Sequence, residues 1–515
     1  MAAGPLSGLA GKALVLVGFM GSGKSTAART LAPDALDSDV LVEADAGAPV
    51  DKIFERDGEA AFRALEERIA LDALERAGRG EGGGVLSLGG GALQSARLRE
   101  ALEAHTVVLL DSDVETVWRR VHRSRRPLAQ DRHAFDQLHR SREALYLDAA
   151  DAIVPAIRRD SLQNALPAIR SLASLPKGTK MLWAESDSGS YPVWIGHDLA
   201  GRFPFPGGKR LAVISDTNVS ALFGEAVPTP MVRLVMAAGE EHKTLETCER
   251  LWGELAAAGL SRDDAVVALG GGVVGDVAGF VAATYQRGVP VIQMPTTLVA
   301  QVDSAYGGKT GVDLPSAKNY VGAYHQPRAV MVDVATLTTL PKEEFSAGMA
   351  EVIKTGLIAG GSLWDKVAAG ADIDANTVLQ CARTKLAVVS EDERDGGRRQ
   401  VLNLGHTIGH AIETVTNYKQ FRHGEAVAIG LMAALRLSQQ EDLRQQVGGL
   451  LAEAGLPLVA SGVDASAVLS AVDSDKKRRG DGSVPFVLCE SPGSVSHGNV
   501  MEAAEVQSAI EEVCS

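Results

Sequence analysis

A short apolar run leading into a glycine-rich loop constrains the fold of the N-terminal part of the chain most strongly. Residues 13–17 (ALVLV) predict a buried parallel strand, and residues 18–26 (GFMGSGKST) follow directly. The pattern G-x-x-x-x-G-K-[ST] after a strand is typical of a phosphate-binding loop, because its glycines let backbone N–H groups surround phosphate oxygens. Lys24 can reach the β- and γ-phosphates, and Ser25 can hold Mg²⁺. The sequence therefore predicts a nucleotide site in an α/β domain, with a chance glycine turn as the alternative.

Carboxylates and arginines that could bind an acceptor follow this loop. Asp37 and Asp39 are expected on the same side of an extended segment, where one organises Mg²⁺ and the other faces an acceptor hydroxyl. Glycines at 89–91 offer bare backbone beside a ligand. Arginines at 125–126 and Arg142 suit phosphate and carboxylate groups, although each alone is more often a solvated surface charge.

In this order and spacing, the motifs resemble those of shikimate kinases over about residues 10–172. The shared motifs are GSGKST, the DxD of Asp37 and Asp39, GE-x-x-FR-x-x-E, GGG, RRPL and R-x-x-x-Y. The resemblance implies ATP-dependent phosphorylation of shikimate, with Asp39 near the attacking hydroxyl and Arg126 at the transferring phosphate. It also implies ATP contacts by Gly21, Ser22, Gly23, Lys24, Ser25, Thr26 and Arg126, shikimate contacts by Asp39, Arg63, Gly90 and Arg142, and Mg²⁺ held by Ser25 and, through water, by Asp37.

Turn-rich, polar segments at 176–180 (PKGTK) and 185–190 (ESDSGS) indicate a domain boundary. We predict a P-loop domain at 1–176 with a parallel sheet and flanking helices. The second part, 177–515, is expected to divide into an α/β lobe at 177–340 and an α-helical lobe at 341–515.

The α/β lobe carries a second glycine-rich turn. Residues 265–269 (AVVAL) predict a strand that leads into residues 270–280 (GGGVVGDVAGF). Such a turn lets a pyrophosphate approach a helix N-terminus. Because it is not G-x-G-x-x-G, a plain tight turn stays open. Lys309, Lys318 and Asn319 lie near further glycines and suit an anionic substrate, with solvated lysines as the alternative.

The helical lobe concentrates candidate metal ligands. His406 and His410 are four residues apart, which places both on one face of a helix. His423 follows, and Glu351 lies upstream, three residues before Lys354. Imidazoles with one carboxylate suit a catalytic zinc with an open position. Spacing alone pairs His406 with His410, and histidines that only cap or pack helices are the alternative.

An NAD-type lobe facing a helical metal lobe is shared by metal-dependent polyol dehydrogenases and 3-dehydroquinate synthases. The motifs GGGVVGD-x-AGF-x-A, Y-x-RG, P-T-T-L-x-A-x-V-D-S, GGKTG, KN and LN-x-GH-x-x-GHA-x-E resemble the synthases over about residues 181–505. The resemblance implies zinc or cobalt bound by Glu351, His406 and His423, with His410 facing substrate. It implies NAD contacts by Glu240, Lys243, Gly272, Val273, Val274, Gly275, Asp276, Thr296, Thr297, Lys309, Lys318, Thr336 and Thr339. Substrate contacts would come from Arg287, Asp303, Asn319, Lys385, Arg399 and Lys477, with Lys354 and His410 as catalytic groups.

The implied reaction converts 3-deoxy-arabino-heptulosonate 7-phosphate to 3-dehydroquinate and phosphate, with NAD used catalytically and no net redox change. A polyol dehydrogenase with a P-loop appendage is one alternative, and it would accumulate NADH. A non-catalytic nucleotide switch is another, but Asp39 and Arg142 argue against it. Asp395 departs from the family's usual Glu, which puts its contact with neighbouring lysines in doubt.

The composition indicates which partners and which cellular compartment to expect. The net charge of −14 argues against nucleic acid as a main partner. No apolar run reaches membrane-spanning length, and residues 1–11 lack the basic and apolar regions of a signal peptide. Four scattered cysteines without a CxxC pair predict a reduced chain. We therefore expect a cytoplasmic enzyme of small molecules, without membrane partners, that forms a homodimer through its synthase part.

Overall fold

The chain divides into two compact units, which are described separately below. The computed structural model describes residues 11–122, 130–206, 208–315, 317–479 and 484–514, and the side chains of 475–479 are outside the description. One unit comprises Met1–Ala184 with Pro192–Trp194, and the other comprises Glu185–Tyr191 with Ile195–Ser515.

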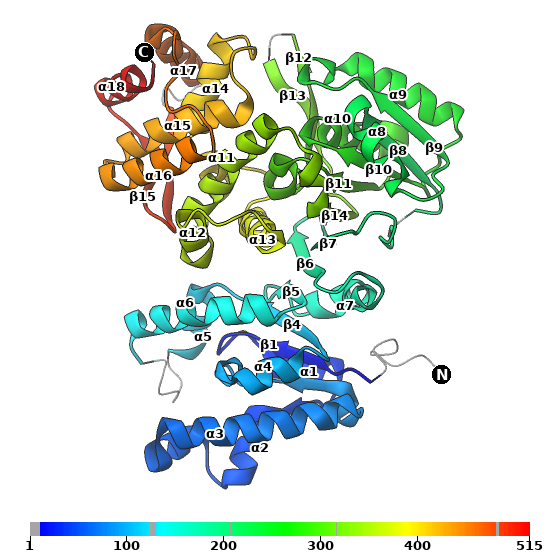
Figure 1. The fold of residues 1–515 in the computed structure, drawn as a ribbon, viewed down its shortest axis with the longest axis vertical. Helices are drawn as coiled ribbons and strands as arrows, with labels where there is room; N and C mark the ends of the chain where they lie inside the picture. Colours follow the sequence, from blue (N-terminus) through cyan, green and yellow to red (C-terminus); the bar gives the residue numbers. More distant parts are fainter. Residues whose placement is uncertain (1–10, 123–129, 207, 316, 480–483, 515) are drawn as a thin grey trace. The chain divides into compact units, whose positions relative to one another are not determined.

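The first unit is a parallel sheet flanked by helices (Figure 1, blue to cyan). Its strands follow the order β2-β3-β1-β4-β5-β6 and pair in parallel. The strands are β1 (Leu14–Val17), β2 (Leu36–Asp37), β3 (Val85–Ser87), β4 (Thr106–Asp111), β5 (Ala152–Pro155) and β6 (Lys180–Ser186). The helices are α1 (Lys24–Leu31), α2 (Ser38–Ala46), α3 (Val50–Gly78), α4 (Ala96–Leu102), α5 (Val114–Val121), α6 (Arg132–Ala149) and α7 (Ser161–Ser171).

Strand β1 lies at the centre of this sheet, between β3 and β4. Its residues LVLV are all buried, as expected for a parallel strand covered on both faces. The loop that follows β1 therefore leaves the sheet at its carboxyl edge, where ligands bind in open α/β sheets.

The α/β lobe of the second unit contains a parallel sheet in the order β14-β11-β10-β8-β9. Its core includes buried Val266 and Ala268 of the central strand. The strands of this lobe are β8 (Leu211–Asp216), β9 (Val232–Met236), β10 (Ala265–Gly270), β11 (Val291–Pro295) and β14 (Ala329–Asp333), with an antiparallel pair β12 (Lys309–Leu314) and β13 (Ala317–Tyr324). Strand β7 (Gly189–Gly196) has residues in both units, because Pro192–Trp194 belong to the first. The helices are α8 (Thr217–Phe223), α9 (Leu245–Ala257) and α10 (Gly272–Thr284).

The second lobe is mainly helical (Figure 1, yellow-green to red). Its helices are α11 (Lys342–Ala359), α12 (Gly361–Ala368), α13 (Ala375–Glu391), α14 (His406–Val415), α15 (His423–Leu437), α16 (Glu441–Glu453), α17 (Ala465–Arg479) and α18 (Ala503–Val513). It also contains an antiparallel hairpin, β15 (Pro485–Ser491) and β16 (Ser494–Val500), which the sequence analysis did not predict.

Glycines bring helix α15 into direct backbone contact with its neighbours. A Cβ atom at Gly424 would overlap the carbonyl oxygen of Ala347 in α11. A Cβ atom at Gly430 would overlap the carbonyl oxygen of Gly405, just before α14. Helix α15 is therefore packed against both neighbouring segments at distances that only glycine permits.

The expected fold classes are confirmed: a P-loop α/β unit, and a unit with an α/β lobe and a helical lobe. The division between the units differs from the predicted boundary at 176/177. Residues up to Ala184 belong to the first unit, because β6 pairs with β5 and its Met181 and Leu182 are buried. In the described part of the chain, none of the helices is long and apolar enough to cross a membrane.

Candidate active sites

The phosphate-binding loop joins β1 to α1, which begins at Lys24. Gly21 and Gly23 have φ angles of 85° and 95°, a region that other residues rarely adopt. A Cβ atom at Gly21 would also lie 2.7 Å from Val121 Cγ1. The Lys24 ammonium folds back over the loop and donates to the Gly18 carbonyl oxygen at 2.8 Å. The loop thus combines glycine backbone in the left-handed region with a buried cation beside it.

The remaining predicted nucleotide residues surround this loop. The Ser22 hydroxyl is buried and has no hydrogen-bond partner among the residues that the structure describes, whereas Ser25 is half-buried and Thr26 is exposed. Arg120, which the sequence analysis missed, donates to the Gly21 carbonyl oxygen at 3.1 Å. Arg126 lies outside the described residues.

Asp37 and Asp39 do not lie on one extended segment, which corrects the expectation from sequence. Strand β2 ends at Asp37, and Asp39 is in the first turn of α2. Asp37 is the N-cap of α2, and its Oδ1 accepts from the Asp39 N–H at 3.1 Å, because an N-cap carboxylate satisfies a free helical N–H. Asp37 Oδ2 is buried without a hydrogen-bond partner in the described ranges, so it could accept from a water molecule on Mg²⁺.

Two carboxylates occupy the space beside Gly89. A Cβ atom there would overlap Asp39 Oδ1 and would lie 2.8 Å from Glu66 Oε1. Glu66 is buried and pairs with Arg63 at 2.5 Å. Burial raises the pKa of Glu66, an effect that the Arg63 cation opposes. Glu66 is the last residue of the GE-x-x-FR-x-x-E motif, and its place in the sequence alone predicts no role for it.

The carbonyl oxygen of Gly90 accepts two hydrogen bonds, from Arg142 Nη1 at 3.0 Å and from the Tyr146 hydroxyl at 2.5 Å. Burial lowers the pKa of Arg142 and raises the pKa of Tyr146 to about 12. The structure thus gathers all four predicted acceptor-binding residues, Asp39, Arg63, Gly90 and Arg142, around residues 89–91.

The glycine turn of the α/β lobe joins β10 to α10, whose N-cap Gly271 supplies no side-chain hydrogen bond. A Cβ atom at Gly271 would lie 2.9 Å from Thr297 Cγ2, and one at Gly272 would lie 3.0 Å from Ser304 Oγ. The hydroxyl of Thr296 is buried without a hydrogen-bond partner among the described residues. Free helical N–H groups beside an unused hydroxyl fit the diphosphate of a dinucleotide. Val273, Val274 and Gly275 form the first turn of this helix.

Charged residues predicted to contact NAD form one network beyond this turn. Lys243 is buried and pairs with Asp276 at 2.6 Å, and it also donates to the Asn319 side chain. Glu240 pairs with Lys318 at 3.3 Å and lies 3.9 Å from Lys243. Although burial opposes its charged form, Asp276 and Glu240 raise the pKa of Lys243. This cluster therefore keeps a buried cation beside the α10 helix.

The hydroxyls of two residues predicted to contact NAD, Thr336 and Thr339, form hydrogen bonds within the protein. The Thr336 hydroxyl donates to the Asp333 carbonyl oxygen at 2.8 Å and accepts from Gln301 at 2.9 Å. The Thr339 hydroxyl donates to the Thr336 carbonyl oxygen at 3.0 Å. Both hydroxyls stabilise the turn after β14, a local use that spacing cannot reveal.

The candidate metal ligands come from three helices. Glu351 of α11 is 1% exposed, and its Oε1 lies 3.6 Å from His406 Nε2 and 3.4 Å from His423 Nε2. One ligand atom from each of these three residues lies within 4.8 Å of the others. His410 shares a helix face with His406, with ring centroids 5.1 Å apart, but it is exposed. Two imidazoles and one carboxylate, with a fourth direction open, are the donor set that a catalytic zinc requires.

Electrostatics at this cluster favour a cation. Burial and the Lys354 ammonium hold the pKa of His406 well below its usual value, so its ring is neutral. Although burial opposes the charge, hydrogen bonds with Glu351 and Glu413 raise the pKa of His423 to about 10. A positive charge is thus stabilised where two carboxylates face the same imidazole.

Cationic side chains that could bind an anionic substrate lie close by. Lys354 is 1% exposed and pairs with Glu351 at 2.5 Å. Lys385 pairs with Asp303 at 2.9 Å. Although burial opposes the charged form, Glu351 and Asp303 raise the pKa of Lys354, so it remains an ammonium. Arg399 is buried and donates to the Glu393 carbonyl oxygen at 2.6 Å.

Three predicted residues stand apart from these contacts. Arg287 is exposed, with a φ of 67°, and has no ion pair in the part of the chain that the structure describes. Lys309 pairs with Asp395, so the shorter carboxylate does reach a lysine. Lys477 is in α17, but its side chain is outside the description.

Comparison with known proteins identifies the families to which the two parts of the chain belong. The shikimate kinase family matches residues 20–172. The N-terminal and C-terminal parts of 3-dehydroquinate synthase match residues 233–347 and 348–478. A 3-dehydroquinate synthase of Halorhodospira halophila is 44% identical over 330 residues, which are 60% of this chain and 93% of that protein. The chain belongs to the 3-dehydroquinate synthase family, with a shikimate kinase domain before it.

Further relatives agree. The synthase of Acidithiobacillus ferrooxidans is 43% identical over 62% of this chain and 94% of its own length. A 2-deoxy-scyllo-inosose synthase, solved with carbaglucose-6-phosphate, NAD⁺ and Co²⁺, has a TM-score of 0.56 at 28% identity, over 65% of this chain and 99% of that one. The 2-epi-5-epi-valiolone synthase of Streptomyces hygroscopicus, with NAD⁺ and Zn²⁺ bound, has a TM-score of 0.57 at 26% identity. The match covers 63% of this chain and 96% of that one. The chain is a bifunctional enzyme of the shikimate pathway.

Proposed function

We propose that Glu351, His406 and His423 hold a divalent metal, zinc or cobalt, for the synthase reaction on 3-deoxy-arabino-heptulosonate 7-phosphate. The observation that carries this proposal is the grouping of their three ligand atoms within 4.8 Å. When bound, the metal supplies a Lewis acid and NAD supplies a hydride acceptor and donor.

The protein's own groups would align the substrate. The Lys354 ammonium, fixed by Glu351, would stabilise negative charge that develops on a substrate oxygen. Lys385 and Arg399 would bind carboxylate or phosphate, together with Asp303 and Asn319. His410, exposed beside His406, would take up or return a proton. The cluster of Glu240, Lys243, Asp276 and Lys318, with the α10 N-terminus, would hold the dinucleotide.

For the kinase, we propose ATP with Mg²⁺ on the phosphate loop. Lys24 would leave the loop carbonyl groups to neutralise the transferring phosphoryl group, and Ser25 and Asp37 would position the metal. Asp39 would accept the proton of the attacking hydroxyl. Arg63 and Arg142 would bind the shikimate carboxylate. Their gathering around residues 89–91 supports this arrangement.

Paired assays test both roles on one preparation. We expect ATP consumption that depends on shikimate, and phosphate release from the heptulosonate phosphate. Dialysis against a chelator should abolish phosphate release, and zinc should restore it. Accumulation of NADH during turnover would instead indicate a dehydrogenase and would overturn the proposed cycle.

We also propose a homodimer formed through the synthase part, in the reducing cytoplasm. The four buried, unpaired cysteines are typical of a reducing compartment. Tyr320 on β13 is 68% exposed, and exposed aromatic side chains are enriched at interfaces. Light scattering on the full chain should give twice the monomer mass, and a monomer would refute the dimer.

A further inference from the structure

His423 belongs to two groups that could hold a metal ion. The first group is Glu351, His406 and His423, and the second is His410, Glu413 and His423. The shared imidazole makes the groups exclusive if each uses its own ring nitrogen, because a neutral imidazole has one lone pair and one N–H. The role of Glu413 then depends on which group takes the metal.

The two ring nitrogens of His423 face two different carboxylates. Nε2 lies 3.4 Å from Glu351 Oε1, and Nδ1 lies 3.4 Å from Glu413 Oε2. If Nε2 coordinates a metal in the first group, Nδ1 carries the proton and donates it to Glu413. A carboxylate in this place fixes the tautomer and the orientation of a ligand imidazole.

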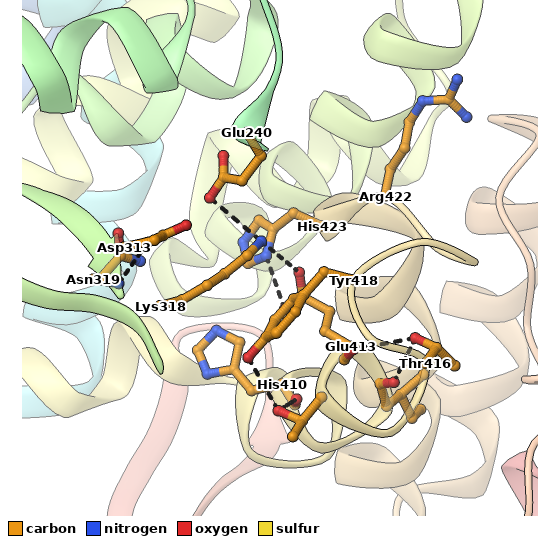
Figure 2. A network of polar contacts seen from close by, with 12 residues as sticks. Glu240, Asp313, Lys318, Asn319, His410, Glu413, Thr416, Tyr418, Arg422 and His423 are labelled. Atoms are coloured by element: carbon orange, nitrogen blue, oxygen red, sulfur yellow. Dashed lines mark hydrogen bonds and ion pairs between the residues drawn. The ribbon is translucent and has the colours of Figure 1, made fainter. Parts of the chain in front are cut away.

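Glu413 also forms an ion pair with a lysine of the α/β lobe. It is 3% exposed, and its Oε1 lies 3.8 Å from Lys318 Nζ. In Figure 2 the Lys318 side chain lies between Glu413 and Glu240. Its Nζ is 3.3 Å from Glu240 Oε1. The same ammonium lies 4.3 Å from the centre of the Tyr418 ring.

An ammonium lies beside each group, Lys354 at Glu351 and Lys318 at Glu413. The second group depends on the exposed His410, whereas the carboxylate of the first group is buried, so we take the first group as the metal site.

We propose that Glu413 is a positioning residue that holds His423 in the orientation required for metal binding with Glu351 and His406. The inference rests on the proposed metal role of these three residues. Glu413 accepts the Nδ1–H of His423 on one oxygen, while Lys318 anchors the other oxygen. The carboxylate therefore ties a ligand of the helical lobe to strand β13 of the α/β lobe.

The test measures zinc affinity of the full chain by competition with a chromophoric chelator. The Glu413→Ala and Glu413→Gln variants are compared with Glu512→Gln, which removes a carboxylate of the same lobe. Glu512 pairs with Arg436 at 2.9 Å and with Arg444 at 3.0 Å, away from the histidines. We expect zinc affinity to fall about 100-fold in Glu413→Ala and about 10-fold in Glu413→Gln, whose amide oxygen can still accept the Nδ1–H. Glu512→Gln should match the wild type.

A spectroscopic measurement separates positioning from general stability. The visible absorption of the Co²⁺-loaded protein should change in both Glu413 variants, because a reoriented His423 alters the ligand field. Circular dichroism and thermal melting report folding independently. If Glu413→Ala does not fold, Glu413→Gln alone decides. Unchanged zinc affinity and an unchanged Co²⁺ spectrum in a folded Glu413 variant would overturn the inference.

Failure of the proposed metal site has a different signature. Wild-type protein that binds no zinc, or that releases phosphate equally well after chelation, would refute the metal role of Glu351, His406 and His423 and the inference with it. Wild-type protein that requires zinc, beside Glu413 variants of equal affinity, would refute only the role of Glu413.

Discussion

The phosphate loop and the candidate metal cluster of Glu351, His406 and His423 are built in opposite ways. In the loop, Lys24 contacts a carbonyl group six residues earlier, and the binding groups are backbone N–H groups of consecutive residues. In the metal cluster, Glu351, His406 and His423 come from three helices that meet only after folding. The loop can therefore be recognised from consecutive residues of the sequence, whereas the cluster depends on how α11, α14 and α15 pack against one another.

This difference explains why helical spacing alone is an incomplete guide to the second site. His406 and His410 share a helix face, as their separation predicts. The buried carboxylate, however, lies within 3.6 Å of His406 and 3.4 Å of His423, and His410 is exposed. Helical periodicity reports which residues share a face, but it does not report which of them meets a partner from another helix.

The largest effect should follow from Lys24→Ala. Removing the cation that neutralises the transferring phosphoryl group should lower shikimate phosphorylation about 10³-fold or more. The synthase reaction should be unchanged if the two sites act independently. Steady-state assays of both reactions check this, with Lys52→Ala, an exposed lysine paired with Glu55, as the control. Loss of both activities in a folded variant would break the comparison of two separate sites.

Next in size is the effect of removing single histidines. His423→Ala should lose bound zinc on dialysis, with affinity reduced more than about 100-fold, since a direct ligand matters at least as much as its supporting partners. His410→Ala should keep near-stoichiometric zinc but react slowly. Metal analysis after dialysis reads both variants. Zinc retained in His423→Ala and lost from His410→Ala would restore the simple pair four residues apart.

Truncation of the kinase should show a moderate effect. A fragment ending at residue 175 should phosphorylate shikimate without the synthase, because all the proposed kinase residues and the family match at 20–172 lie before that residue. It should be less stable than a fragment ending at 186, since it lacks the buried Met181 and Leu182 of β6. Burial of two such side chains contributes roughly 3–6 kcal/mol. Urea denaturation compares the two, and equal midpoints would restore the boundary at 176/177.

The smallest effect is expected for Asp395→Glu. Asp395 already pairs with Lys309, whose side chain is half exposed and can adjust to a longer partner. The kcat/KM of the synthase should change by less than about threefold, within the range of an exposed ion pair. Asp395→Ala removes the pair and serves as the reference. A tenfold gain in Asp395→Glu would show that the shorter side chain limits this site.

The sequence predicted elements well where one local rule decides. The strand, loop and helix around Lys24, and the glycine turn before α10, lie where their motifs place them. Asp39 was misplaced because Asp37 ends the strand and caps helix α2 at once, which puts Asp39 in the helix. The hydrogen bond that Gln301 donates to the Thr336 hydroxyl could not be predicted, since the two residues are distant in sequence. The residue roles stay predictions until the variants are measured.

Glu413 and Glu66 show what sequence reasoning leaves out. Both are buried carboxylates whose neighbours include predicted site residues, His423 in one case and Arg63 in the other. A glutamate within a helix is ordinarily a solvated surface residue. Only the packed structure reveals that these two are buried.

The close contacts of Gly424 and Gly430 limit how this chain can drift by mutation. Any single-base change of a glycine codon that alters the amino acid adds at least a Cβ atom, or ends the chain. At both positions that atom would overlap a carbonyl oxygen of a neighbouring segment. Most residues of α15 are buried, and at these two positions a backbone atom excludes even the methyl group of alanine. Every amino-acid change there would therefore displace the helix that begins at the candidate ligand His423.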